Sequence, residues 1–97
     1  MLKISYHKKA RNELAKAGCF YSSKSLELGS RFFETFDLAV ANIWQFPYRF
    51  PKVEHDLRRC LLHKFPFGIC YRIENNTIRI LAIAHTSRHP NYWKKRS

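Results

Sequence analysis

Acidic residues, long apolar runs and closely spaced cysteines are scarce or absent in this sequence, and each lack excludes a class of protein. The chain has seven Asp and Glu residues against eighteen Lys and Arg residues. No segment approaches the ~18 apolar residues that a membrane-spanning helix needs. Residues 1–6 contain one Lys and no apolar run of the length typical of a signal peptide. We therefore expect a cytoplasmic protein without a membrane partner.

The cysteines and histidines do not form a metal-binding pattern. Cys19, Cys60 and Cys70 are odd in number and include no Cys-x-x-Cys pair, which argues against a disulfide framework and against a structural zinc site. The spacings of the histidines between His63 and His89 match no zinc motif. A Gly-rich phosphate loop and a nucleotide fingerprint are also missing. We expect neither a metal nor an organic cofactor.

The excess of basic residues points to an anionic partner. The formal net charge is +11 over 97 residues, and a field of this strength attracts polyanions. The partner is then a nucleic acid or an acidic protein, and the remaining alternative is a basic surface that serves solubility alone. The chain length and the 45% hydrophobic content suit a single domain, residues 1–97, with one core.

The first half of the chain has one strand pattern and two helical patterns. Apolar residues at positions 2, 4 and 6 alternate with polar ones, which predicts a strand over residues 1–6. Apolar residues then recur every three to four positions from about residue 8 to 22 and again from 29 to 46, where Phe46-Pro47 stops the second helix. Residues 22–25 break the pattern and offer hydroxyl caps. We expect a helical hairpin over about residues 8–46, followed by an irregular, exposed connection from Tyr48 to Asp56.

The clearest pattern is a β-hairpin between Phe67 and His85. Its centre is Asn75-Asn76, a pair that tolerates the positive φ angles of a type I′ turn. With a two-residue turn, the predicted pairs on the apolar face are Ile73 with Ile78, Tyr71 with Ile80, Ile69 with Ala82 and Phe67 with Ala84. The predicted pairs on the other face are Arg72 with Arg79, Cys70 with Leu81 and Gly68 with Ile83, and His85 ends this face.

The second face of the hairpin is predicted to be basic. Arg72 opposite Arg79 is unfavourable by a few tenths to about 1 kcal/mol, so such a pair usually needs water or an anion between the charges. A preceding strand, roughly Leu57 to Lys64, brings either Arg58 or Arg59 into line with this pair. Three guanidiniums in a row suit phosphates, because each can donate two hydrogen bonds to phosphate oxygens. The alternatives are that the hairpin arginines splay into solvent, or that one of these arginines caps a helix or pairs with Glu54 or Asp56.

The order of these elements and several short motifs resemble the ParE/RelE toxin superfamily. The motifs are Arg58-Arg59, Phe65-Pro66-Phe67, Tyr71-Arg72-Ile73, the run from Ile80 to His85 and the tail from His85 to Trp93. The tail, with His, Arg, Pro and Tyr-Trp in that order, looks more like the ParE-type and plasmid-stabilisation branch than like the RelE ribonucleases. The resemblance implies an α+β fold of β-α-α-β-β-β order, in which a three-stranded antiparallel sheet over about residues 57–85 packs on the helical hairpin.

The resemblance also implies a toxin of a type II toxin-antitoxin pair, whose main partner is a cognate acidic antitoxin. A groove beside a basic sheet suits an acidic, partly disordered chain that folds on binding, and a sheet edge can accept an added strand. Operator DNA is expected to be bound only through the antitoxin complex. In the ParE-like reading the toxin is no enzyme and stalls DNA gyrase. In the RelE-like reading it enters the ribosome and cleaves mRNA, and a third reading is a non-toxic basic nucleic-acid-binding domain.

We expect the ParE-like target, because Lys52 and Lys64 lie too far apart to stand for the paired lysines of the ribonuclease branch. RNA cleavage needs a base, an acid and a cation beside the phosphate. For those roles the candidates are His85, Tyr92 and Arg59. The candidates for binding the target or its phosphates are Arg58, Arg59, Arg72, Arg79 and Arg88. The alternatives are structural: a hydrogen-bonding His85, a Tyr92 and Trp93 that anchor the tail, and a solvated Lys94–Arg96 run within the basic tail, residues 86–97.

Overall fold

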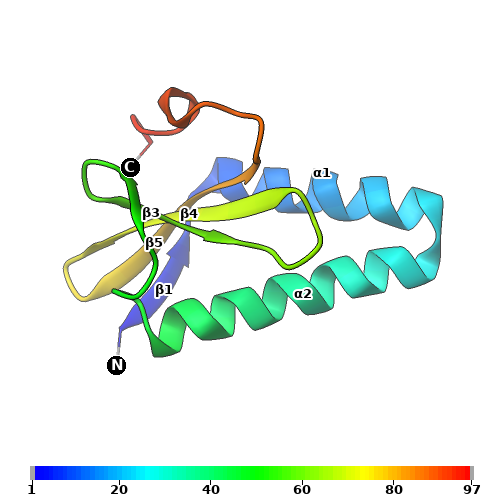
Figure 1. Cartoon of the computed structure of the whole chain (residues 1–97), viewed down its shortest axis with the longest axis horizontal. Helices are drawn as coiled ribbons and strands as arrows, with labels where there is room; N and C mark the ends of the chain where they lie inside the picture. Colours follow the sequence, from blue (N-terminus) through cyan, green and yellow to red (C-terminus); the bar gives the residue numbers. More distant parts are fainter. Residues whose placement is uncertain (1, 97) are drawn as a thin grey trace.

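In the computed structural model, a helical hairpin packs on one face of a five-stranded sheet, so the fold is α+β (Figure 1). The structure describes residues 2–96. The elements are β1 (Lys3–Tyr6), α1 (Lys8–Lys24), α2 (Leu26–Gln45), β2 (Lys52–Glu54), β3 (Leu57–Leu61), β4 (Phe67–Glu74), β5 (Thr77–His85) and the 3-10 turn η1 (Pro90–Tyr92). A strand, two helices and then an antiparallel hairpin follow one another as the sequence predicted.

A single residue, Ser25, separates the two helices. Its extended backbone, with φ −165° and ψ 152°, reverses the chain, while its N–H donates to Tyr21 O and its Oγ accepts from Leu28 N at 3.0 Å. The predicted hydroxyl cap is therefore confirmed. The predicted break over residues 22–25 was wrong in length, because α1 continues to Lys24. Serine tolerates a helix interior at small cost, and Ser23 Oγ donates to Phe20 O there.

The helices cross closely because glycine removes a side chain at the crossing. A Cβ on Gly29 of α2 would lie 3.0 Å from the Cα of Ser22 in α1, and closer still to the Ser22 hydroxyl. The backbone of α1 cannot give way as a flexible side chain can, so the crossing requires a residue without Cβ at this position.

The strands are ordered β1-β5-β4-β3-β2, with β1 parallel to β5 and the other neighbours antiparallel. Strand β2 corrects the prediction of an irregular connection over Tyr48–Asp56, and it makes the sheet larger than expected. It has only three residues and an irregular pairing with β3, so it is too short to show an alternating pattern. Strand β3 ends at Leu61 rather than near Lys64, which has a positive φ of 65° in the following turn.

The predicted hairpin register holds only near its turn. Asn75 and Asn76 have φ angles of 50° and 61°, and Arg72 lies opposite Arg79, as predicted. A β-bulge at Leu81 then shifts the pairing by one residue, because β5 inserts an extra residue opposite β4. The observed pairs beyond it are Cys70 with Ala82, Ile69 with Ile83, Gly68 with Ala84 and Phe67 with His85. His85 therefore lies opposite Phe67, not at the end of the arginine face.

The sheet has a buried apolar layer on each face. The larger layer lies under the helices and includes Phe32, Ile43 and Tyr71, whose hydroxyl donates to Pro47 O at 2.7 Å. The second layer consists of Leu57, Cys70, Leu81, Ala82, Ala84 and Trp93. The prediction of a basic, half-exposed second face was thus wrong for the middle of the sheet, where apolar residues lie under the tail.

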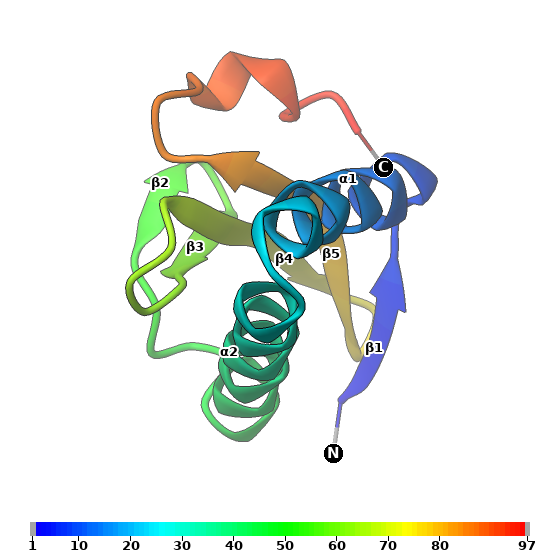
Figure 2. The same ribbon diagram turned by 90° about the vertical axis from the view of Figure 1, so that its right-hand side faces the viewer.

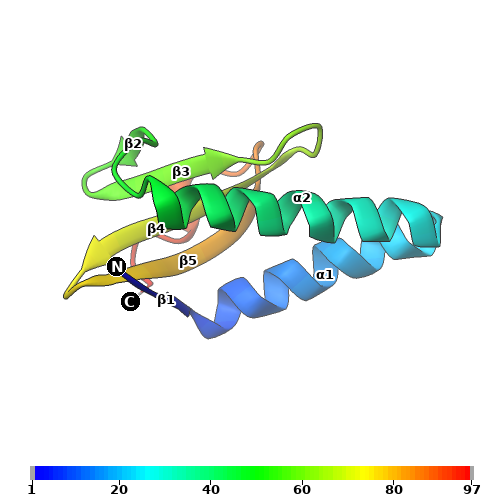
Figure 3. The ribbon, with the colours of Figure 1, turned by 90° about the horizontal axis from the view of Figure 1, so that it is seen from below.

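The C-terminal tail covers this second face. Figure 2 shows the tail passing over the sheet on the side away from α2, and Figure 3 shows the two helices in front of the sheet with the tail behind it. Trp93 is 1% exposed. The role of Trp93 as an anchor is confirmed. The alternative of a solvated Lys94–Arg96 run was wrong for Lys94 and Arg96, whereas Lys95 is exposed. Lys94 Nζ lies 3.3 Å from Glu54, and Arg96 forms an ion pair with Glu13.

Candidate functional site

The candidate site residues fall into two groups. Arg58, Arg59, Arg72 and Arg79 lie on β3, β4 and β5. The second group, His85, Arg88 and Tyr92, lines a groove between α1, the end of β5 and the tail. The structure therefore separates His85 from the arginines of the sheet, with which the sequence analysis had placed it on one face.

Arg72 and Arg79 are held by backbone and hydroxyl acceptors. Arg72 donates to the carbonyl oxygen of Arg96 in the tail at 2.7 Å, and Arg79 donates to Ser5 Oγ at 3.3 Å. Arg72 Nε is buried without a hydrogen-bond partner among residues 2–96. The predicted pairing of Arg72 with Arg79 is thus confirmed. Their guanidinium N–H groups, which were expected to face an anion, instead donate to the tail and to β1.

The predicted ladder of three arginines is not formed. Strand pairing puts Arg58 opposite Tyr71 and Arg59 opposite Cys70, so neither faces Arg72. Arg58 instead donates to Tyr48 O at 3.1 Å and Phe50 O at 2.7 Å, which fixes the connection before β2. The alternative that a strand arginine pairs with a carboxylate was also wrong for Arg58, because both of its acceptors are backbone carbonyl oxygens.

Arg59 packs over Gly68 on the neighbouring strand. A Cβ on Gly68 would lie 2.9 Å from Arg59 Cδ, so glycine leaves the space for the arginine stem. Arg59 points its charge toward the tail-covered face, since the residue paired with it, Cys70, belongs to that layer. It does not lie among the described residues that line the groove of the second group.

The groove has a volume of about 330 Å³ and combines cationic, acidic and aromatic side chains. It is lined by Glu13, Lys16, Ala17, Phe20, Phe67, Ile83, Ala84, His85, Arg88 and Tyr92. Sequence reasoning found the last three of these but missed the contribution of α1. Lys16 and Phe20 are four residues apart on one helix face and off the buried stripe, and this spacing is the signal that was available.

His85 forms a local cap at the end of β5. Its Nδ1 accepts from the Ser87 N–H at 3.1 Å and lies 2.8 Å from Ser87 Oγ, and its ring packs edge-on to Phe67. The backbone donor assigns the lone pair to Nδ1, so the neutral ring carries its proton on Nε2. His85 therefore has the hydrogen-bonding role that was the alternative to catalysis. Its ring still lines the groove.

Two guanidinium groups contact the ring of Tyr92. The Cζ atoms of Arg88 and Arg96 are 4.6 and 4.9 Å from the centre of its ring. Such contacts stabilise a cation over an aromatic face by roughly 0.5–1 kcal/mol at exposed sites. Tyr92 is 45% exposed, so it belongs to the groove rim rather than to the buried layer that holds Trp93.

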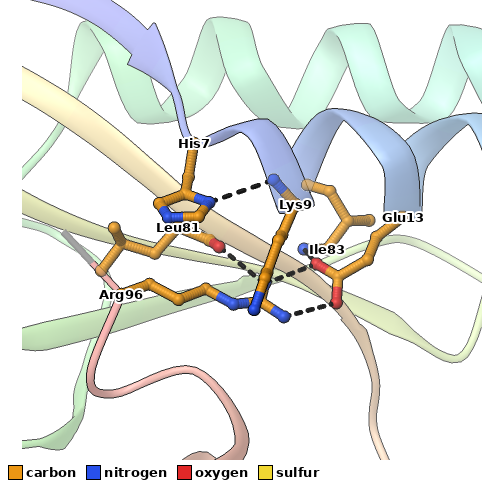
Figure 4. Close-up of polar contacts among 6 residues, drawn as sticks. All are labelled: His7, Lys9, Glu13, Leu81, Ile83 and Arg96. Carbon is orange, nitrogen blue, oxygen red and sulfur yellow. Dashed lines mark hydrogen bonds and ion pairs between the residues drawn. The ribbon is translucent and has the colours of Figure 1, made fainter.

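Glu13, which lines the groove, forms an ion pair with Arg96 of the tail (Figure 4). Arg96 donates to both oxygens of Glu13, at 2.9 and 3.1 Å, and also to Leu81 O at 2.9 Å. Glu13 Oε1 accepts from Ile83 N at 3.1 Å. The pairing of β1 with β5 ends at Ile80. The ion pair therefore satisfies backbone groups of β5 where no strand continues beside it.

His7 lies beside this ion pair and caps α1. Its Nδ1 accepts from Lys9 N at 3.0 Å (Figure 4), which requires an unprotonated Nδ1. Burial lowers the pKa of His7, and the positive charges of Arg96, Arg79 and Lys9 lower it further, while Glu13 opposes them. The neutral form that the cap needs is therefore favoured.

The groove assembles part of the set that RNA cleavage would need. His85, Arg88 and Tyr92 share the groove, whereas Arg59 lies on the face under the tail. Within residues 2–96, no group of three or more His, Cys, Asp or Glu residues is placed to hold a metal ion. Nor is any described helix both long and apolar enough to cross a membrane.

One comparison with known proteins identifies a family, and another identifies a similar fold. Residues 4–90 match the family model described as "ParE toxin of type II toxin-antitoxin system, parDE". A solved structure described as "Chromosomal ParDE TA system from P. aeruginosa" superposes with a TM-score of 0.76 at 20% identity, over 88% of this chain and 96% of that chain. At this identity, the structural likeness concerns the fold alone. The comparison with curated proteins gives no match.

Proposed function

The chain belongs to the ParE toxin family of type II toxin-antitoxin systems, and we propose that it inhibits DNA gyrase and is neutralised by a cognate acidic antitoxin. The observation that carries the proposal is the family match over residues 4–90. The net charge of +11 suits both an acidic antitoxin and a target that carries DNA. In this proposal the toxin acts in the cytoplasm by binding, stalls gyrase on cleaved DNA, and contacts operator DNA only through the antitoxin.

The groove supports binding better than catalysis. Arg59, the cation nominated for RNA cleavage, is not among the described residues that line the groove with His85 and Tyr92. His85 Nδ1 is occupied by Ser87. One observation favours the alternative, a ribosome-dependent mRNA endonuclease: His85, Arg88 and Tyr92 still line one groove.

Two parallel assays separate these functions. The purified full chain is added to a gyrase supercoiling reaction and to a reconstituted translation reaction. We expect loss of supercoiling with accumulation of cleaved DNA, and unchanged translation. The Arg88→Glu variant should need at least about tenfold more protein for half-inhibition, which corresponds to about 1.4 kcal/mol of binding free energy.

Lys52→Glu is the matched control, because it makes the same charge change at the exposed far edge of the sheet. It should inhibit gyrase like the unaltered chain. Inhibited translation with new mRNA cleavage and untouched gyrase would contradict the proposal. In that case His85→Ala should abolish the cleavage.

A further inference from the structure

The backbone of the connection from α2 to β2, residues 46–51, is fixed by hydrogen bonds (Figure 1). Four carbonyl groups of residues 46–50 accept bonds of 2.7 to 3.1 Å. The donors are the N–H of Arg49, the hydroxyl of Tyr71 on β4 and the guanidinium of Arg58 on β3, which donates twice. The bond from Arg49 closes a turn that begins at Phe46. The connection is therefore preorganised before any ligand arrives.

The side chains of this turn remain open to solvent. Phe46 is 44% exposed and Tyr48 is 66% exposed, and Arg49 is exposed as well. The Cζ atom of Arg49 lies 4.0 Å from the centre of the Phe46 ring. The Cζ atom of Arg58 lies 5.5 Å from the centre of the Tyr48 ring. Each ring thus has a cation beside it, and Tyr48 keeps most of its surface free for a second flat group.

Phe46, Tyr48 and Arg49, which we call the aromatic turn, lie in a basic part of the chain. Residues 38–53 contain two cations and no Asp or Glu. The next carboxylate along the chain, Glu54, forms an ion pair with Lys94. The aromatic turn is not among the described residues that line the groove. It is therefore a separate surface that offers aromatic rings and positive charge to an anionic ligand.

We propose that the aromatic turn binds a single-stranded nucleic acid. One base stacks on the exposed ring of Tyr48, and the guanidinium of Arg49 donates to a neighbouring phosphate. The ring of Phe46 supports that guanidinium from the other side of their contact. Arg58 fixes the backbone of Tyr48 through the bond to its carbonyl oxygen. This binding goes beyond gyrase inhibition and does not depend on it.

The exposed ring of Tyr48 distinguishes a single strand from other anionic ligands. In a duplex, neighbouring bases cover each other's faces, so duplex DNA offers Tyr48 no base on which to stack. An acidic peptide can pair with Arg49, but its carboxylates give the ring no flat partner. A single strand supplies an unpaired base and a phosphate at every step, which matches the two kinds of group in the aromatic turn.

Fluorescence anisotropy with the full chain tests the stacking. The probes are a fluorescein-labelled decathymidylate and an abasic deoxyribose-phosphate strand of the same length and charge. We expect the thymidylate to bind at least about tenfold more tightly, because only it can stack. Tyr48→Leu should remove this preference, and Tyr48→Phe should keep it because phenylalanine retains the ring. Equal binding of the two strands to the unaltered chain, or an unchanged preference in Tyr48→Leu, would overturn the proposal.

Salt dependence tests the phosphate contact. Arg49→Gln should weaken thymidylate binding at least about fivefold and reduce the magnitude of the slope of log affinity against log salt by about 0.7, the value for one single-strand phosphate. Arg11→Gln is the matched control, because Arg11 is also exposed and its Cζ lies 5.4 Å from the centre of the Tyr6 ring. It should bind the thymidylate like the unaltered chain. Equal losses in the two variants would mean diffuse attraction by the net charge and would reject the site.

Two further probes test the class of ligand. A labelled DNA duplex and a labelled decaglutamate should each bind Tyr48→Leu as they bind the unaltered chain. If either probe loses as much affinity as the thymidylate does, the turn binds that class of ligand and the proposal fails. Circular dichroism of each variant confirms that it is folded. Gyrase supercoiling is assayed separately, so inhibition of gyrase and binding of a single strand can fail independently.

Discussion

The two faces of the sheet are covered by different structures, the helical hairpin on one face and the C-terminal tail on the other. On one face, α1 and α2 bring their own backbone hydrogen bonds and a continuous apolar layer that includes Phe32 and Ile43. On the other face, a tail with a single 3-10 turn relies on Trp93 and a few polar contacts. Regions with few buried contacts open locally before the whole molecule unfolds. We therefore expect the tail to detach from the sheet more readily than the helices do.

Native cysteines report on each face separately. Cys60 is buried under the helices, Cys70 is buried under the tail, and Cys19 is exposed. Burial raises the pKa of Cys60 to about 11 and that of Cys70 to about 12. Alkylation requires the thiolate, so both buried thiols should react slowly while their covers are closed. Labelling followed by peptide mass spectrometry therefore measures the opening of each cover.

The largest expected effect comes from truncating the central aromatic residue of each layer. Phe32→Ala should lower the free energy of unfolding by about 3–5 kcal/mol, as large-to-small core changes do, and should speed labelling of Cys60 and Cys70 alike. Trp93→Ala should speed labelling of Cys70 alone, because the tail can detach while the helices stay packed. Urea unfolding measures the first effect and alkylation the second.

Cys19 provides the reference rate in both variants, since it is exposed throughout. If Trp93→Ala exposes Cys60 as much as Cys70, the two covers open together. The distinction between the two faces would then be lost.

An intermediate loss of stability is expected when the ion pair between Glu13 and Arg96, which joins the tail to α1, is removed. The side chains of Glu13 and Arg96 are 16% and 10% exposed. Glu13→Gln leaves the guanidinium without its partner charge, and we expect a loss of about 1–3 kcal/mol, below the full cost of a completely buried pair. Cys70 should label faster in this variant, and urea unfolding gives the free energy.

Glu27→Gln is the matched control, because Glu27 forms an ion pair with Arg31 on the exposed side of α2. Exposed i,i+4 pairs contribute only about 0.2–0.5 kcal/mol. Equal losses at Glu13 and Glu27 would mean that the tail is not held by its ion pair.

The smallest effect is a pH dependence of stability at His7, which caps α1 close to Arg96 and Glu13. The pKa of His7 is lowered in the folded chain, first by burial and then by Arg96, Arg79 and Lys9. The unfolded chain therefore binds the proton more readily, so this contribution is fully present above the unfolded pKa of about 6.5 and declines as the pH falls below it. His7→Asn keeps a capping acceptor and should reduce this slope. Urea unfolding between about pH 5 and 8 tests this, and identical slopes would rule His7 out.

Much of the fold was predictable because it depends on nearby residues. Helical periodicity, the cap at Ser25 and the Asn75-Asn76 turn are local features, and each lies where the sequence placed it. The candidate site was only partly predictable. His85, Arg88 and Tyr92 follow one another in the chain and share the groove, whereas Lys16 and Phe20 reach it from α1.

The sequence by itself determined the helical hairpin, the arginine pair beside the turn, the strong positive charge and the family. Tertiary structure alone decided which residues face which side beyond Leu81, because one bulge reverses the order of every later side chain. Tertiary structure also decided which partners the charged side chains of the tail contact. Arg96 meets Glu13 across 83 positions and thereby joins the tail to α1, and no local pattern encodes a contact between such distant residues.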